Sequence, residues 1–190
     1  TSVSFIEENL LANSYVRIPY PSMILPVMEF LRNTTSHSFS EANSDHIDAL
    51  QNWYWNTGFS ERYSAKSNDR LMIDLEMMRD LIESNSLPTN YSSLFPRRLE
   101  SADDLLEISS PAGSIPRSVH ALINHHSRGY ANWKNGATCV KTEKHDNHHI
   151  FPRGFLEEND IPQKDIDCVA NRTYIPKITN IKIGKKSPGE

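Results

Sequence analysis

The segment His148-His149-Ile150-Phe151-Pro152 is the stretch that most constrains how this chain can fold. Pro152 fixes its own φ angle and disfavours a helical conformation at Phe151, so the residues before it are expected to be extended. Side chains on an extended segment alternate between two faces. We therefore expect His148 and His149 to point in opposite directions and to have different roles.

Two asparagines, Asn171 and Asn180, follow this segment. The residues just after Asn171 are predicted to be extended, and a short helix that carries Asn180 is predicted to start near Pro176. Upstream, Ala137–Thr142 is predicted to be a strand that pairs with about Asn147–Phe151. The expected architecture is a β-hairpin followed by a helix that brings Asn180 back towards the hairpin.

These motifs together resemble a known family. His148–Pro152 resembles the (Asp/His)-His-Ile-x-Pro signature of HNH nucleases, whose site is a β-hairpin plus one helix around a metal ion. The closer resemblance is to the HNH domain at the C-terminus of GmrSD-type, modification-dependent restriction enzymes. Asn171–Ile175 resembles that family's Gly-Asn-Leu-Thr-Leu segment, and Thr179–Pro188 resembles its closing Asn-x-x-Ile-x-x-Lys-x-Pro segment. The motifs cover roughly residues 137–188.

The chemistry implied by the resemblance is hydrolysis of a phosphodiester bond, which needs a base and a cation. His149 suits the base, because an imidazole titrates near neutral pH. His148 and Asn180 suit the metal ion. The position of His148 is more often Asp in the wider HNH class, and a nitrogen ligand favours Mn²⁺, Co²⁺ or Ni²⁺ over Mg²⁺. Asp146 is close enough in sequence to bind the metal if His148 does not.

Other residues are assigned by the same resemblance. Asn171 is expected to fix the loop and to orient the His149 ring, although a backbone carbonyl could hold the ring instead. Lys185 is expected to contact the scissile or a flanking phosphate. DNA contacts are also expected for three further cations, which are Arg153, Lys182 and Lys186. The segment Gly154–Asp165 is predicted to be a long polar loop.

The first half of the chain has helical patterns. The clearest helix is predicted over Asp69–Ser84, with an apolar stripe that includes Leu71, Leu75, Met78 and Leu81. The run from Trp53-Tyr54-Trp55 to Arg62-Tyr63-Ser64 resembles the helical spacer that precedes the nuclease in GmrSD-like proteins. These aromatic residues could stack on bases, but packing between helices is the interpretation we favour.

A break at Ser110-Pro111-Ala112-Gly113-Ser114 is the predicted domain boundary. After it, a helix is predicted from Pro116 to about Ser127, with Val119, Leu122 and Ile123 facing inward. We therefore expect a mainly helical α+β fold, with a helical spacer domain at 1–110 and a ββα-metal (HNH) nuclease domain at 111–190. We also expect the second unit to fold without the first.

The amino-acid composition limits which kinds of binding partner are expected. A net charge of −4 over 190 residues argues against a free-standing basic protein that coats DNA, but four lysines between 177 and 186 leave room for a local basic groove. The two cysteines, Cys139 and Cys168, show no zinc-knuckle spacing. No signal peptide or long apolar run is visible, so the expected location is the cytoplasm, with no membrane partner.

The function predicted from these observations is a metal-dependent endonuclease that acts on double-stranded, modified DNA in a restriction or antiviral defence system. The chain is expected to be part of a longer protein, whose N-terminal, nucleotide-dependent domain is not included in this sequence. The alternative is a catalytically inactive HNH-like module that binds DNA or protein. The sequence does not predict the oligomeric state.

Overall fold

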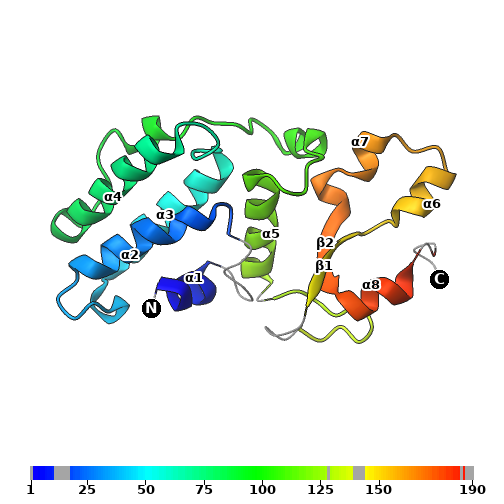
Figure 1. The fold of residues 1–190 in the computed structure, drawn as a ribbon, viewed down its shortest axis with the longest axis horizontal. Coiled ribbons are helices and arrows are strands. Elements are labelled where there is room, and N and C mark those ends of the chain that lie inside the picture. The colour runs from blue at the N-terminus through cyan, green and yellow to red at the C-terminus, as the bar shows by residue number, and fades with distance from the viewer. Residues whose placement is uncertain (1, 11–17, 128, 139–143, 185, 187–190) are drawn as a thin grey trace.

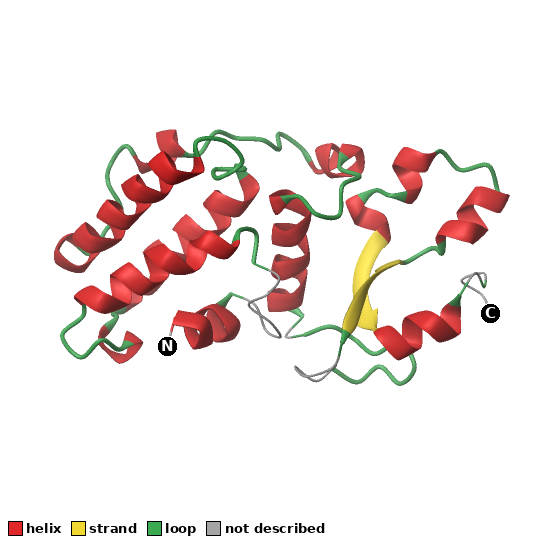
Figure 2. Cartoon of the chain, viewed as in Figure 1, coloured by secondary structure: helices red, strands yellow, loops and turns green. Residues whose placement is uncertain are grey.

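The computed structural model describes residues 2–10, 18–127, 129–138, 144–184 and 186 (Figure 1). It is a mainly helical α+β protein with one small antiparallel sheet, as expected (Figure 2). Among the described residues, no helix is both long and apolar enough to cross a membrane.

The first half of the chain is built from helices. The α-helices are α1 (Ser2–Asn9), α2 (Ile24–Asn33), α3 (Ser44–Phe59) and α4 (Ser67–Ser84). Short 3₁₀ helices connect or follow them: η2 (Pro21–Met23), η3 (Phe39–Glu41), η4 (Tyr91–Leu94) and η5 (Ala102–Glu107). The second half contains α5 (Ser114–His126), β1 (His145–His149), α6 (Arg153–Glu158), α7 (Gln163–Ile166), η6 (Val169–Asn171), β2 (Arg172–Pro176) and α8 (Lys177–Ile183).

The main hydrophobic core lies between the helices of the first half. Trp53 and Tyr54 of α3 are fully buried there, together with Phe30 of α2 and Leu81 of α4. The preferred interpretation of the aromatic run, packing between helices, is therefore confirmed for these two rings. Met78 also lies on the predicted inner face of α4 and is buried.

A buried carboxylate lies inside this core, where the apolar stripe of α4 did not predict one. Asp74 accepts hydrogen bonds from Trp53 Nε1 at 3.0 Å, from Arg62 Nη2 at 2.6 Å and from the Tyr63 hydroxyl at 2.5 Å. Arg62 also donates to the Leu94 carbonyl at 2.7 Å. Because a buried charge is tolerated only when it is paired and hydrogen-bonded, these contacts explain why Asp74 can be buried.

Helix α5 lies between the helical half and the sheet (Figure 1). The prediction that Leu122 and Ile123 face inward is wrong, because these side chains are 44% and 53% exposed. Apart from Ile115 near its start, the buried residues of α5 are smaller or polar, and Ser118 and Ala121 are among them. The physical reason is close helix packing, since a Cβ added to Gly58 of α3 would lie 2.1 Å from Ser118 Oγ.

The other side of α5 approaches the sheet. The rings of His120 and Tyr174 are 5.1 Å apart, and the Tyr130 hydroxyl donates to the His120 carbonyl at 3.0 Å. Helix α5 begins at Ser114, next to the predicted domain boundary, and it packs on α3 as well as on the sheet. The division at residue 110, and the independent folding of the second unit, remain predictions.

The sheet pairs β1 with β2 in antiparallel register, so that His148 lies opposite Thr173 and His149 opposite Arg172. The extended segment after Asn171 and the helix after Pro176 are both found where the sequence predicted them. Among the described residues, β1 pairs with β2 rather than with the predicted upstream strand Ala137–Thr142, so the predicted hairpin is wrong in its partner strand. Thr138 forms an isolated bridge with Ala131, and residues 139–142 lie outside the described residues.

The segment after β1 also differs from expectation. The predicted loop Gly154–Asp165 is largely helical, because it contains most of α6 and α7. Proline precedes each of these helices, at positions 152 and 162, and each proline has the non-helical ψ angle, 135° and 140°, expected of a residue just before a helix. The two short helices return the chain from the end of β1 to the start of β2 (Figure 1).

Candidate active site

Two faces of the short sheet carry two different groups of polar residues, because side chains alternate along β1. Asp146 and His148 share one face, and helix α8 contributes Asn180 to it. His149 is on the opposite face, where Arg172 of β2 lies beside it. The opposite orientation of His148 and His149, predicted from the extended segment, follows from their places in the strand.

On the first face, Asn180 joins the other two residues. Its Nδ2 atom donates to Asp146 Oδ2 at 3.0 Å, and its side chain is hydrogen-bonded to His148. His148 is buried, and among the described residues its Nε2 atom has no hydrogen-bond partner. The Trp133 ring meets the His148 ring edge to face, with centroids 5.6 Å apart. The side chains of Trp133, Asp146, His148 and Asn180 therefore form a compact group between β1 and α8.

Burial lowers the pKa of His148, and the hydrogen bond with the Asn180 side chain and the charge of Asp146 only partly oppose this effect. The lowered pKa favours the neutral ring, which is the protonation state that binds metal ions. A buried imidazole nitrogen without a partner, beside a carboxylate and an amide, fits a divalent cation. Within the described part of the chain, however, no three His, Cys, Asp or Glu side chains are grouped to hold a metal ion. The amide of Asn180 would be the third protein ligand beside Asp146 and His148.

On the opposite face, His149 is held by an acidic residue that the sequence analysis missed. His149 Nε2 lies 3.0 Å from Asp167 Oδ1, and Arg172 Nη2 lies 2.7 Å from the same oxygen. Gln163 donates to the other carboxylate oxygen. The hydrogen bond with His149 is the largest cause that holds the pKa of Asp167 below its usual range, and Gln163 and Arg172 add to it. Asp167 therefore stays ionised and faces the imidazole.

Asn171 contacts the backbone on both sides of the helical segment between β1 and β2. Its Oδ1 atom accepts from the Phe151 backbone N–H at 2.8 Å, and its Nδ2 atom donates to the Ile166 carbonyl at 2.9 Å. The Asn171 amide thus joins the loop after β1 to the end of α7. This is the loop-fixing contact expected of it, whereas the ring of His149 is contacted by Asp167 rather than by Asn171.

The expected DNA-binding cations do not all lie together. Arg153 is exposed on α6 and pairs with Glu157 at 2.6 Å, an ion pair that raises the pKa of the arginine. Lys182 and Lys186 line a groove beside α8, which Arg153 does not line. Lys185 lies outside the described residues.

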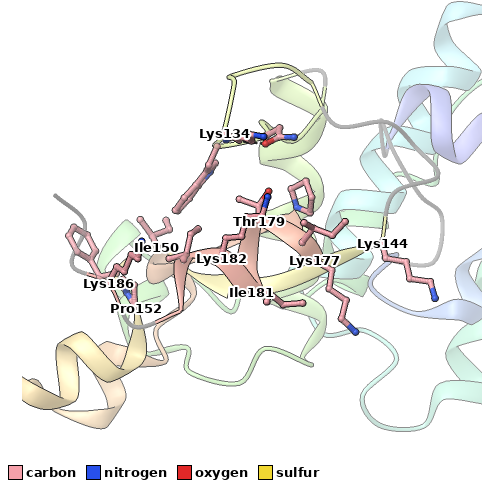
Figure 3. Close-up of a pocket in the computed structure, with 15 residues that line it drawn as sticks. Lys134, Lys144, Ile150, Pro152, Lys177, Thr179, Ile181, Lys182 and Lys186 are labelled. Atoms are coloured by element: carbon pink, nitrogen blue, oxygen red, sulfur yellow. Dashed lines mark hydrogen bonds between the residues drawn. The ribbon is translucent and has the colours of Figure 1, made fainter. Parts of the chain in front are cut away.

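The groove beside α8 has a volume of about 1010 Å³, and we call it the lysine groove (Figure 3). Its cations come from three parts of the chain and are Lys134, Lys144, Lys177, Lys182 and Lys186. Only the last three follow the sheet in sequence, so the sequence analysis did not associate Lys134 and Lys144 with them. Trp133 also lines the groove and connects it to His148.

The chain is similar to a protein of uncharacterized function. No protein-family model and no solved structure matches the chain. It is similar to the uncharacterized protein MJ0686 of Methanocaldococcus jannaschii, with 31% identity over 173 residues. The matched region is 90% of this chain and 28% of that protein, so the chain spans little more than a quarter of the relative's length.

Proposed function

We propose that this chain is the nuclease part of a metal-dependent, HNH-type DNA endonuclease. The observation that carries the proposal is the separation of two neighbouring histidines into two chemical environments. His148 lies with Asp146 and Asn180, which are groups that suit a cation. His149 faces Asp167 on the other side of β1, an arrangement that suits a base.

The contact with Asp167 determines which nitrogen of His149 can act as the base. A carboxylate can only accept a hydrogen bond, so the 3.0 Å contact requires the proton of the neutral ring to be on Nε2. The Nδ1 atom is then unprotonated and can take a proton from a water molecule that attacks phosphorus. Arg172 shares the same carboxylate oxygen and helps to keep it ionised.

The residues on the other face would hold the cation. Asp146 contributes oxygen, His148 contributes its buried Nε2, and Asn180 lies between them. When bound, a divalent metal ion would stabilise the negative charge that develops on the phosphate and on the leaving 3′ oxygen. Mg²⁺ and Mn²⁺ are both candidates, and a nitrogen ligand also allows Co²⁺ or Ni²⁺. The lysine groove would bind phosphates of the strand that is cleaved.

The wider biology is proposed from the sequence resemblance alone. By that resemblance, the chain would be part of a cytoplasmic restriction or antiviral defence enzyme that acts on modified double-stranded DNA. A nucleotide-dependent domain would precede it in the intact protein. The helical half, α1 to α4, would then be the spacer between that domain and the nuclease.

Nicking of supercoiled plasmid DNA by the purified chain tests the proposal. Nicking is expected with Mn²⁺ or Mg²⁺ and should stop when EDTA is added. His149→Ala should reduce the rate by about 10²- to 10⁴-fold, the usual contribution of a general base. His126→Ala replaces an exposed histidine of α5 and should have no effect. If the wild-type chain bound DNA but did not nick it with any of the four metals, the inactive binding module would be the better interpretation.

A further inference from the structure

The lysine groove exposes large apolar side chains between its cations. Trp133 is 43% exposed and Phe151 is 48% exposed, and both line the groove. Ile178 and Ile181 of α8 also line the groove, and each is 69% exposed. Such a concentration of exposed apolar surface marks an interaction site on a folded protein.

The charges of the groove indicate what kind of partner it fits. Five of the fifteen described lining residues are lysines, and none of these fifteen is Asp or Glu. The chain as a whole has a net charge of −4, so this local excess of positive charge is not a general property of the surface. Lys134 lines the groove from the loop before β1, and Lys177 and Lys182 line it from α8 (Figure 3). An extended, negatively charged partner could contact all of these lysines at once.

We propose that the lysine groove binds single-stranded nucleic acid, with unpaired bases stacked on Trp133 and Phe151 and phosphates on the lysines. Exposed aromatic rings between cations are the usual platform for single strands, because every unpaired base offers a face for stacking. A duplex keeps its base faces stacked inside, so contacts to its backbone would need only the lysines.

The position of Trp133 connects this binding to the candidate active site. Its ring contacts both the groove and the His148 ring, whose centroid is 5.6 Å away. A strand stacked on Trp133 would therefore lie against the ring that contacts His148, although Asp146, His148 and Asn180 do not themselves line the groove. This inference rests on the proposed function only for the cleavage of the bound strand, and binding itself can be measured without any metal ion.

Fluorescence anisotropy with the full 190-residue chain in EDTA tests the inference. The probe is a labelled oligothymidylate of about 12 nucleotides, within the usual site size of such grooves. The comparison probe is a mixed-sequence duplex of the same length, measured at the same salt concentration. The single strand is expected to bind at least about tenfold more tightly than the duplex.

Substitutions locate the binding surface. Trp133→Ala and Phe151→Ala should each weaken binding of the single strand by about 5- to 150-fold, which is the usual effect of losing one stacked base. Trp133→Phe should restore most of the loss, which separates stacking from damage to the fold. Met72→Ala replaces an exposed apolar side chain on α4 and is the matched control.

The salt dependence of the binding affinity tests the role of the lysines independently of the aromatic residues. Lys177→Ala should lower the slope of log affinity against log salt concentration by about 0.7, the value for one phosphate contact with a single strand. Arg97→Ala removes an exposed positive charge from the helical half and should leave this slope unchanged.

The outcomes separate this inference from the proposed function. Equal or tighter binding of the duplex, or aromatic variants that bind like wild type, would overturn the inference even if the chain nicks plasmid DNA. Failure of the single strand to bind would do the same. Tight binding of the single strand through Trp133, without cleavage in any metal, would support the inference and contradict the nuclease.

Discussion

The Nε2 atom of His149 lies 3.0 Å from Oδ1 of Asp167, and this contact joins the end of β1 to the segment that leads into β2. Asp167 is itself held by Arg172 and Gln163. Asp167 therefore holds the ring of His149 at Nε2, and Nδ1 would be the nitrogen that acts as the proposed base.

Asp167→Ala should lower the rate of plasmid nicking without abolishing it. The loss should be about 10- to 100-fold, as is common when a residue that orients a functional histidine is removed. Because Asp167 acts through His149, the effect should fall on kcat rather than on KM, and adding it to His149→Ala should cause little further loss. Steady-state and single-turnover rates of the three variants test this. Asp165→Ala, an exposed neighbour, is the control.

The depressed pKa of Asp167 predicts how stability depends on pH. The unfolded state takes up the proton near the ordinary Asp value of about 3.9, whereas the folded state takes it up at lower pH. The carboxylate therefore stabilises the fold above that value, and the contribution is lost as the pH falls through the folded pKa. Urea unfolding of wild type and Asp167→Asn should show a difference in free energy that shrinks as the pH drops below about 4. A constant difference from pH 7 to pH 3 would contradict this.

The identity of residue 148 should set the metal preference. Wild type is expected to be at least as active in Mn²⁺, Co²⁺ or Ni²⁺ as in Mg²⁺, because imidazole is a borderline ligand. His148→Asp should shift the preference towards Mg²⁺, and His148→Ala should weaken the affinity for every metal. Rates titrated against each metal test this. An unchanged preference in His148→Asp would mean that His148 is not a ligand, and Asp146→Asn would then be the variant to examine.

Gly58 is needed for the contact between α3 and α5. A Cβ at this position would lie 2.1 Å from Ser118 Oγ and 3.0 Å from Pro19 Cγ. Gly58→Ala should therefore destabilise the fold by about 1–3 kcal/mol, although alanine is the better helix former. Thermal unfolding would measure the loss, and adding Ser118→Gly should recover part of it. A Gly58→Ala variant as stable as wild type would show that the helices separate easily.

The buried pair of Arg62 and Asp74 should be among the most sensitive positions of the helical half. Their side chains are 3% and 0% exposed. Arg62→Met leaves the Asp74 carboxylate buried without its charge partner, which should cost about 3–5 kcal/mol. Tyr63→Phe removes one hydrogen bond to the same carboxylate and should cost less, about 1.5–3 kcal/mol. Urea unfolding of both variants would check this order, and equal losses would contradict it.

Features that depend on neighbouring residues could be predicted from local sequence patterns. Pro152 and the alternation along β1 predicted opposite directions for His148 and His149, and Pro176 predicted the start of α8. The apolar periodicity of α4 placed Met78 in the core. These predictions succeed because backbone sterics and helical or strand periods act over a few residues.

Contacts between residues that are distant in sequence could not be predicted in this way. Asp167 is 18 residues from His149, and Trp133 reaches the groove of α8 from before β1. The inner face of α5 was mispredicted because the helix packs closely on α3 at Gly58, where small residues fit better than Leu122 or Ile123. Such contacts depend on the path of the whole chain and on the space left between its elements, which local patterns do not contain.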